Sequence, residues 1–361
     1  MGLKNNTQKP ISQLFKKQNM SPKNLNAPNK THSLLFKHLK KKQIFDYYKK
    51  FESNLGIQEN FIVAVSGGPD SLALSYLAKI YSLKKKLKIK FFIVDHKLRK
   101  KSTEEAKFVK KKLKQYSMNL NVLTWVGKKP KKNIQSIARN KRYSLIIDKA
   151  KKLKIKNILL GHHKDDLFEN FFIRILRGSG LNGLVSLEQK TQIDKVSLLR
   201  PLLNFNKQDL IYISNNIFES FVEDPSNKDD KFKRVRIRNF LRQLEIEGMD
   251  KNKFLLTIKN LKYANKSIKF YTKKNLEDNA FFLKNKNSYI LKKDFVNHPH
   301  EIVFRSLSEI IKRIGKKYYP MRGKKIDKLI ELINTKPSFK VTLGDCVIKK
   351  VNESVIVSKE Y

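Results

Sequence analysis

Apolar and polar segments alternate along the first two thirds of the chain in a way that predicts strands and helices in turn. Short apolar runs without polar interruption read as buried strands, and the stretches between them carry apolar positions at helical spacing. This order is typical of an α/β fold, with a parallel sheet and helices on both faces. The expected strands are 61–65, 89–94, 120–126 and 157–160, and the expected helices begin near residues 71, 102, 135 and 164.

The pattern changes near Gly248 to long amphipathic helices, followed by a stretch that alternates as short strands. We therefore expect an α/β domain over 32–245 and a mainly helical region over 246–361 that ends in β-strands. Residues 1–31 are polar, rich in Lys and Asn, and predicted to form a disordered basic tail, within which Met20 offers an alternative start. The expected helices of the second region are 254–271, 302–314 and 325–333, and the expected strands lie within 339–357.

The composition narrows the classes of partner. A formal net charge of +47 over 361 residues attracts polyanions such as RNA, DNA or anionic lipid, although lysine-rich solvated faces would produce the same excess. A single cysteine, Cys346, excludes a disulfide framework and favours a reducing cytoplasm. No apolar run approaches the roughly 18 residues of a membrane span, so we expect no membrane partner.

The first expected strand runs directly into a glycine turn and the start of a helix. This arrangement binds anions, because backbone N–H groups approach phosphate oxygens and the helix dipole favours negative charge. An aspartate in such a turn repels bare phosphate, and is therefore expected to act as a ligand of Mg²⁺. The alternative is an ordinary strand-to-helix turn. The residues of the turn are Ser66, Gly67, Gly68, Pro69, Asp70 and Ser71.

Further polar side chains follow the later strands, where open α/β sheets place their ligand groups. Asp95 follows the second strand, and two histidines with three acids follow the fourth. On a helix that begins near Lys164, Asp165 and Glu169 are one turn apart and form a face suited to an ammonium group or Mg²⁺. Acids that merely favour the helix dipole are the alternative. The cluster comprises His162, His163, Asp165, Asp166 and Glu169.

Several arginines are candidates for contacts to phosphate or RNA. Two lie in the helix 135–153, and one stands beside a glycine-rich turn. One lies in a predicted edge strand within 198–203 that Pro201 ends, where it faces the site or solvent, and three belong to a basic run that would suit an RNA backbone. Solvated helix faces and an ordinary helix C-cap are the alternatives. These residues are Arg139, Arg142, Arg177, Arg200, Arg234, Arg236 and Arg238.

Seven motifs occur in one order between residues 61 and about 240: SGGPDS, VDHKLR, ARNKRY, GHHKDD with Glu169, RGSGLNGL, RPLL, and EDPSN followed by KRVRIR. This ordered set resembles the tRNA(Ile)-lysidine synthetases, a family of N-type ATP pyrophosphatases with the PP-loop, adenine nucleotide alpha-hydrolase-like fold. The chain departs from the family at two places. It has Leu167-Phe168-Glu169-Asn170 where the family has Gln-Ala-Glu-Thr, and Val235 where the family has Asn.

The resemblance implies an ATP- and Mg²⁺-dependent ligase. It would adenylate C2 of the wobble cytidine, position 34, in the CAU anticodon of tRNA(Ile), and the ε-amine of free L-lysine would then displace AMP to give lysidine. A cytoplasmic location and a homodimer are compatible with this. The implied roles are catalysis for Asp70, His162, His163 and Arg200; ATP binding for Ser66, Gly67, Gly68, Pro69, Asp70, Ser71, Asp95, Arg139 and Arg177; lysine binding for Asp165, Asp166 and Glu169; tRNA binding for Arg142, Arg234, Arg236 and Arg238; and Mg²⁺ binding for Asp70.

Other functions stay open at this point. A PP-loop enzyme that thiolates tRNA with protein-borne or cluster-borne sulfur would need cysteines near the site, and an amidotransferase-type synthetase would need an ammonia source. A noncatalytic RNA-binding protein would need only the charge. Exchange of pyrophosphate into ATP that depends on tRNA would separate an enzyme from such a binding protein.

Overall fold

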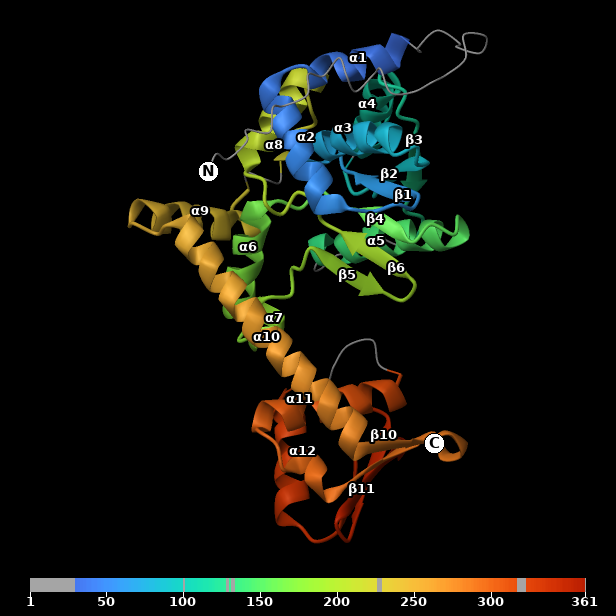
Figure 1. Ribbon diagram of the computed structural model, residues 1–361, viewed down its shortest axis with the longest axis vertical. Coiled ribbons are helices and arrows are strands. Elements are labelled where there is room, and N and C mark those ends of the chain that lie inside the picture. Colours follow the sequence, from blue (N-terminus) through green and yellow to red (C-terminus); the bar gives the residue numbers. More distant parts are fainter. Residues whose placement is uncertain are drawn as a thin grey trace, which may run out of the picture. The chain divides into compact units, whose positions relative to one another are not determined.

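The computed structural model describes residues 30–99, 101–127, 130, 134–225, 229–316 and 323–360. Residues 1–29 of the predicted disordered tail lie outside the described residues, and helix α1 (Lys30–Leu39) includes the last two positions of that predicted tail. The chain divides into two compact units (Figure 1). One contains residues up to 179 together with 186–247, and the other contains 180–185 and 248–361.

The first unit is built on a six-stranded sheet in the order β3-β2-β1-β4-β6-β5. Every neighbouring pair is parallel except β5 and β6, which form an antiparallel hairpin. The predicted α/β class with a parallel sheet is therefore confirmed. The strands are β1 (Phe61–Val65), β2 (Ile89–Asp95), β3 (Leu120–Thr124), β4 (Asn157–Leu159), β5 (Lys190–Ile193) and β6 (Val196–Leu199).

The strand predicted within 198–203 and ended by Pro201 is present in part, as the last residues of β6, but its predicted position at the edge of the sheet is wrong. Strand β6 ends at Leu199 and lies between β4 and β5, so β5 forms the edge of the sheet. The chain reverses between these two strands at Asp194, whose φ of 50° lies in the left-handed region. Because β5 carries alternating polar side chains and no apolar run, its sequence gave little indication of a strand.

Helices cover both faces of this sheet (Figure 1). Successive side chains of a strand point to opposite faces, so each buried strand contributes apolar side chains to two cores. On β1, Phe61, Val63 and Val65 pack into a core shared with α1, α2, α3, α4 and α8, whereas Ile62 packs into a second core with α5. The remaining helices of the unit, α6 and α9, pack against each other. The helices are α2 (Lys42–Leu55), α3 (Pro69–Lys84), α4 (Ser102–Lys114), α5 (Ile134–Lys152), α6 (Lys164–Ile175), α8 (Lys207–Phe218) and α9 (Lys233–Ile246).

The order of the strands creates a switch point between β1 and β4. From β1 the chain moves outward to β2 and β3, and then crosses to β4 on the other side of β1. Ligands of open α/β sheets bind outside the carboxyl ends of the strands at such a point. The loops that follow β1 and β4 meet there, since a Cβ on Gly161 would lie 3.3 Å from the carbonyl oxygen of Asp70.

The described part of the second unit joins three long helices and the short helix α7 to a five-stranded antiparallel sheet in the order β7-β8-β11-β10-β9. The three helices and the strands of 339–357 agree with the prediction, whereas the four-residue strands β7 and β8 were missed. None of the described helices is both long and apolar enough to cross a membrane. The elements are α7 (Leu181–Leu184), α10 (Lys251–Asn279), β7 (Ala280–Leu283), β8 (Ser288–Leu291), α11 (His300–Ile314), α12 (Gly323–Thr335), β9 (Phe339–Thr342), β10 (Cys346–Val351) and β11 (Ser354–Lys359), with 3₁₀ turns at Lys284–Lys286 and Lys293–Val296.

Candidate active site

The loop between β1 and α3 is shaped by a glycine and a buried serine. Gly67 has a φ of 89°, and a Cβ there would lie 2.7 Å from Val109 Cγ2, so this position requires glycine. The Ser71 hydroxyl accepts hydrogen bonds from the N–H groups of Ser66 and Gly67, both at 3.1 Å, and donates to Gly68 O at 3.0 Å. The first turn of α3, like that of any helix, has N–H groups without intrahelical partners, which suits an anion.

Asp70 lies in the first turn of α3 and is held by a lysine that sequence reasoning missed. Lys207 Nζ donates to both Asp70 carboxylate oxygens, at 2.7 and 2.8 Å. Lys207 is the first residue of α8 and is 137 residues away from Asp70 in the sequence. No motif marks it, and the helix that it begins was not predicted from the sequence.

His163 connects Asp70 to the helix that follows β4. It is the N-cap of α6: its Nδ1 accepts from Asp165 N at 3.3 Å, and its own N–H donates to Asp166 Oδ2 at 2.9 Å. The ring is 6% exposed, and Nε2 lies 3.7 Å from Asp70 Oδ2. His163 and Asp70, predicted to act in one site, are therefore brought together.

His162 is a neutral histidine in this structure. Arg139 Nη2 lies 3.0 Å from its Nε2, and because a guanidinium can only donate, that nitrogen must accept and Nδ1 must carry the proton. Burial lowers the pKa of His162 to about 3; the charge of Asp166 opposes this shift, and those of Arg139 and Arg200 add to it. A neutral imidazole at physiological pH can orient a ligand by hydrogen bonding, but it does not exchange protons near pH 7.

The low pKa of His162 predicts a loss of stability in mild acid. The unfolded chain protonates this histidine near its ordinary pKa of 6.5, whereas the folded chain stays neutral to about 3. The free energy of unfolding therefore falls as the pH drops from 7 to 5, by about 2 kcal/mol from this group. Urea unfolding of His162→Gln, whose amide oxygen can still accept from Arg139, should show a smaller fall over the same interval. An equal fall in both proteins would contradict the assignment.

Two acids of α6 pair with two arginines of α9. Glu169 is 1% exposed, and Arg238 Nε lies 2.5 Å from its Oε1. Arg234 Nη1 lies 4.0 Å from Glu169 Oε2 and 3.8 Å from Asp166 Oδ1. Burial raises the pKa of Glu169, helped by the charge of Asp166 and opposed by Arg238. Burial alone would also raise the pKa of Asp166, but the two neighbouring histidines, a backbone N–H and Arg234 lower it to about 2.

The three acids predicted to bind lysine thus have different surroundings. Asp166 accepts a hydrogen bond from the backbone N–H of His163 at the N-terminus of α6, and Glu169 forms an ion pair with Arg238. Asp165 keeps a third of its side chain exposed, and its Oδ2 is 3.9 Å from His163 Nδ1. One turn of α6 separates Asp165 from Glu169, as expected, but the two side chains differ in exposure, 33% against 1%.

Three other predicted site residues make contacts within the first unit. Asp95 accepts hydrogen bonds from Lys97 N, Ser102 Oγ and Thr103 Oγ1, so it organises the loop between β2 and α4. Ser102, the first residue of α4, uses its hydroxyl for this contact. Arg142 donates to His96 Nε2, and Arg200, which is 6% exposed, donates to Glu188 O and Thr191 Oγ1.

The structure does not bring Arg177 to the loop after β1. Arg177 follows the C-terminal end of α6, whereas the loop meets the N-terminal end of that helix. Twelve residues of α-helix span about 18 Å, and the ATP-binding role of Arg177 stays a prediction. The glycine-rich turn after it leads into α7, which belongs to the other unit. Arg236 is exposed and donates only to the carbonyls of Asp230 and Lys231 among its described contacts.

The two departures from the family pattern have structural explanations. Asn170 Nδ2 lies 3.4 Å from Ser186 Oγ, at the start of the segment that leads to β5. Val235 is 6% exposed and packs inside the unit, so its apolar side chain is compatible with its surroundings.

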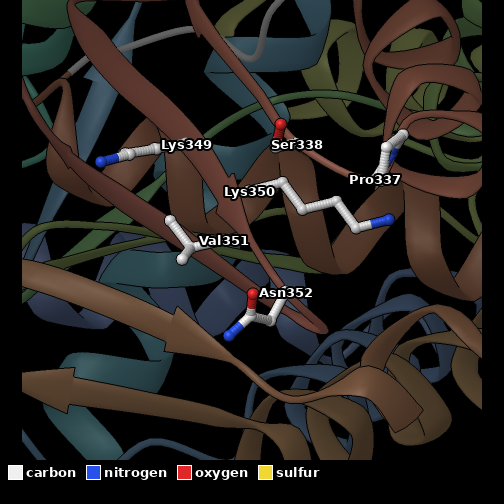
Figure 2. A pocket seen from close by; sticks show the side chains of 6 residues that line it. All are labelled: Pro337, Ser338, Lys349, Lys350, Val351 and Asn352. Atoms are coloured by element: carbon white, nitrogen blue, oxygen red, sulfur yellow. The ribbon is translucent and has the colours of Figure 1, made fainter.

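A cavity of about 620 Å³ lies in the second unit (Figure 2). Its lining carries no carboxylate, histidine or cysteine, and the Lys350 ammonium donates to the carbonyls of Ile333 and Lys336 at the end of α12. That contact neutralises a helix C-terminus and involves no group of the candidate site. The lining residues are Pro337, Ser338, Lys349, Lys350, Val351 and Asn352.

Comparison with known proteins agrees with this geometry. Residues 39–245 match the model of the PP-loop domain family. The tRNA(Ile)-lysidine synthase of Wolbachia pipientis wMel is 34% identical over 305 residues, which are 82% of this chain and 70% of that protein. The enzyme of the same name from Bradyrhizobium diazoefficiens is 36% identical over 213 residues, covering 58% of this chain and 59% of that one.

Among solved structures, the U34-tRNA thiolase NcsA of Methanococcus maripaludis, determined with its 4Fe-4S cluster, matches with a TM-score of 0.53 at 15% identity. The match covers 61% of this chain and 78% of that one and demonstrates a shared fold alone. The family model covers more than half of the chain, and the Wolbachia relative is matched over more than two thirds of its length. The chain therefore belongs to the tRNA(Ile)-lysidine synthase family of ATP-using PP-loop ligases.

Proposed function

We propose that this chain converts the wobble cytidine of a tRNA(Ile) with a CAU anticodon to lysidine, consuming ATP and free L-lysine. The observation that carries the proposal is the meeting of Asp70, in the loop after β1, with the acid-rich start of α6 after β4. An anion site and a cation site are thereby adjacent. This is what a reaction between ATP and an amine requires.

The site fits ATP that arrives with Mg²⁺. Among the described residues, no group of three or more histidine, cysteine or acidic side chains could hold a metal ion by itself. Mg²⁺ bound to nucleotides commonly uses one or two carboxylates, with phosphates and water as its other ligands. Asp70, a quarter exposed beside the helix N-terminus, is the carboxylate that would hold it. The bound ion would neutralise charge on the phosphates.

The proposed chemistry has two displacements. Cytidine O2 attacks the α-phosphate of ATP and pyrophosphate leaves; the lysine ε-amine then attacks C2, AMP leaves, and a proton is lost from the nitrogen. The chain contributes mainly by positioning and by stabilising charge. Backbone N–H groups at the start of α3 would bind phosphate oxygens, and His162, held in one tautomer by Arg139, would orient the base or the nucleotide.

We infer that Asp165 contributes most of the attraction for the lysine substrate. Glu169 and Asp166 remain part of the proposed pocket, but arginines of α9 already balance much of their charge. Asp165 is the most exposed of the three carboxylates. A charge-assisted hydrogen bond to an ammonium contributes about 1.5–3 kcal/mol.

Asp165→Asn should therefore raise the lysine concentration needed for half-maximal product by about ten- to a hundredfold. Adenylated tRNA should accumulate, and high lysine should partly restore lysidine. Quenched reactions over a lysine series would measure this. Asp194→Asn is the matched control, because it removes an exposed acid of the β5–β6 turn. If Asp165→Asn instead blocks pyrophosphate release at every lysine concentration, the residue belongs to the ATP site.

We propose the first unit as the catalytic domain and the second as an accessory tRNA-binding region. The positive charge of the chain supports a nucleic-acid partner, and single-stranded anticodon bases can be splayed out into a pocket. On α10, Lys259 and Lys266 lie over the exposed ring of Tyr263, a combination suited to RNA. Arg234 and Arg238 are oriented toward acids, so Arg236 is the best supported of the predicted tRNA contacts in α9.

Thiolation is less well supported as an alternative. The single cysteine, Cys346, is fully buried in β10 of the second unit. It is therefore a poor carrier of sulfur for the proposed site.

The test of the proposed function is exchange of labelled pyrophosphate into ATP. We expect exchange to require tRNA(Ile) with the CAU anticodon and to be absent with the same tRNA carrying a different wobble base. If neither tRNA supports exchange, the alternative of a noncatalytic RNA-binding protein would be favoured.

A further inference from the structure

Lys207 contacts Asp70 directly, and the proposed chemistry gives its ammonium no role. Its ammonium contacts both carboxylate oxygens at 2.7 and 2.8 Å, and its side chain is 36% exposed. The contact joins the first turn of α3 to the first residue of α8.

Three helix N-termini converge around this contact. Helix α3 begins at the loop, α6 begins at His163 next to Asp70, and α8 begins at Lys207 itself. The starts of α6 and α8 are tied together by the hydrogen bond from Lys164 N to Phe205 O, at 3.0 Å. A lysine in the first turn adds positive charge where the dipole is already positive, which costs stability. Such a violation of a local rule is expected at functional sites.

The packing of α8 does not depend on this ion pair. Leu210 and Ile213 of α8 are fully buried in the core that includes Leu72 of α3. A partly exposed ion pair contributes at most about 1 kcal/mol, so apolar burial holds the two helices together. The position of Lys207 therefore calls for a role other than stability.

We propose that Lys207 is a phosphate-binding residue of the ATP site, and that Asp70 neutralises it until the substrate arrives. The proposal rests on the proposed function. A cation that binds Asp70 competes with the ammonium for the same two oxygens. The released ammonium then lies within reach of the polyphosphate, where it binds oxygens of the β- and γ-phosphates and of the departing pyrophosphate. The lysine ammonium suits this exchange of partners, because it is a compact charge at the end of a flexible side chain.

The competition can be tested without measuring catalysis. In Lys207→Gln, Mn²⁺ alone, followed by its electron paramagnetic resonance signal, should bind about tenfold more tightly than in the wild type, because its competitor is gone. The magnesium complex of pyrophosphate, followed by calorimetry, should bind about tenfold more weakly, whereas Lys207→Arg should stay within a few-fold of the wild type.

The matched control is Lys41→Gln. Lys41 also bonds to α8, through Asn216 Oδ1 at 2.7 Å, and its loss changes the net charge equally. It should alter neither affinity. If folded Lys207→Gln binds pyrophosphate as well as a normally binding wild type does, the role of Lys207 is overturned, while the proposed function is not affected. If Lys207→Gln does not fold, loss of pyrophosphate binding in folded Lys207→Arg overturns the proposal, and retained binding supports it. A wild type that binds neither ATP nor pyrophosphate would overturn the proposed function as well.

Discussion

Asp70→Asn is expected to lower the rate of tRNA-dependent pyrophosphate release by about a hundredfold or more. Asparagine keeps the size of the side chain but removes the negative charge that would hold Mg²⁺ beside the phosphates. The fold should persist, because the lost ion pair with Lys207 is partly exposed and contributes at most about 1 kcal/mol. Binding of tRNA, measured by filter retention, should stay within a few-fold of the wild type.

Asp194→Asn serves again as the control for a lost acidic charge. It should release pyrophosphate at the wild-type rate. Normal release by Asp70→Asn would rule out Asp70 as the carboxylate of the ATP site. Loss of tRNA binding together with activity would instead indicate that the substitution damages the first unit as a whole.

Arg238→Met is expected to lower the free energy of unfolding of the first unit by about 3 kcal/mol at pH 8. The substitution leaves the Glu169 carboxylate, 1% exposed, without the arginine that contacts its Oε1. The other oxygen, Oε2, has no hydrogen-bond partner among the described residues. Urea unfolding would measure the change. Arg236→Met, two positions before Arg238 in α9, removes an exposed arginine whose described hydrogen bonds go only to carbonyls, and it should change stability by less than about 0.5 kcal/mol.

The single variant Glu169→Gln and the double variant Glu169→Gln with Arg238→Met complete the cycle. The double variant should recover much of the stability lost in Arg238→Met, because no buried charge remains unpaired. Additive losses would show that the two side chains do not interact. In that case the Glu169 carboxylate would be available to the lysine substrate, and the larger role given to Asp165 would be wrong.

The parts of the fold that local sequence determines were predictable. Strand β1 is an uninterrupted apolar run, and the turn after it needs glycine at Gly67 for reasons of φ and space. Helix α6 begins at Lys164, as its acidic first turn indicated. Strand β5 and helix α8 were not predicted. The hairpin depends on pairing with β6, and α8 is stabilised by burial against α3, so neither leaves a strong local pattern.

The residues of the candidate site were predictable by type, but their pairing was not. Opposite charges 69 positions apart in Glu169 and Arg238, or 137 apart in Asp70 and Lys207, meet only because of the tertiary fold. Sequence spacing therefore presented Glu169 as an available carboxylate, although it is buried against arginines. Arg177 shows the opposite situation: it is close to the acids in the sequence, but it follows the C-terminal end of α6, away from the loop after β1.

The central claim is that the chain joins lysine to a tRNA base, and transfer of labelled lysine tests it most directly. Purified protein would be incubated with ATP, Mg²⁺, labelled L-lysine and tRNA(Ile) bearing the CAU anticodon, and the RNA would then be digested to nucleosides. We predict label in one modified cytidine at position 34, none without ATP, and none when the wobble cytidine is replaced by uridine. RNA that stays unlabelled while the same protein binds tRNA and hydrolyses ATP would contradict the account.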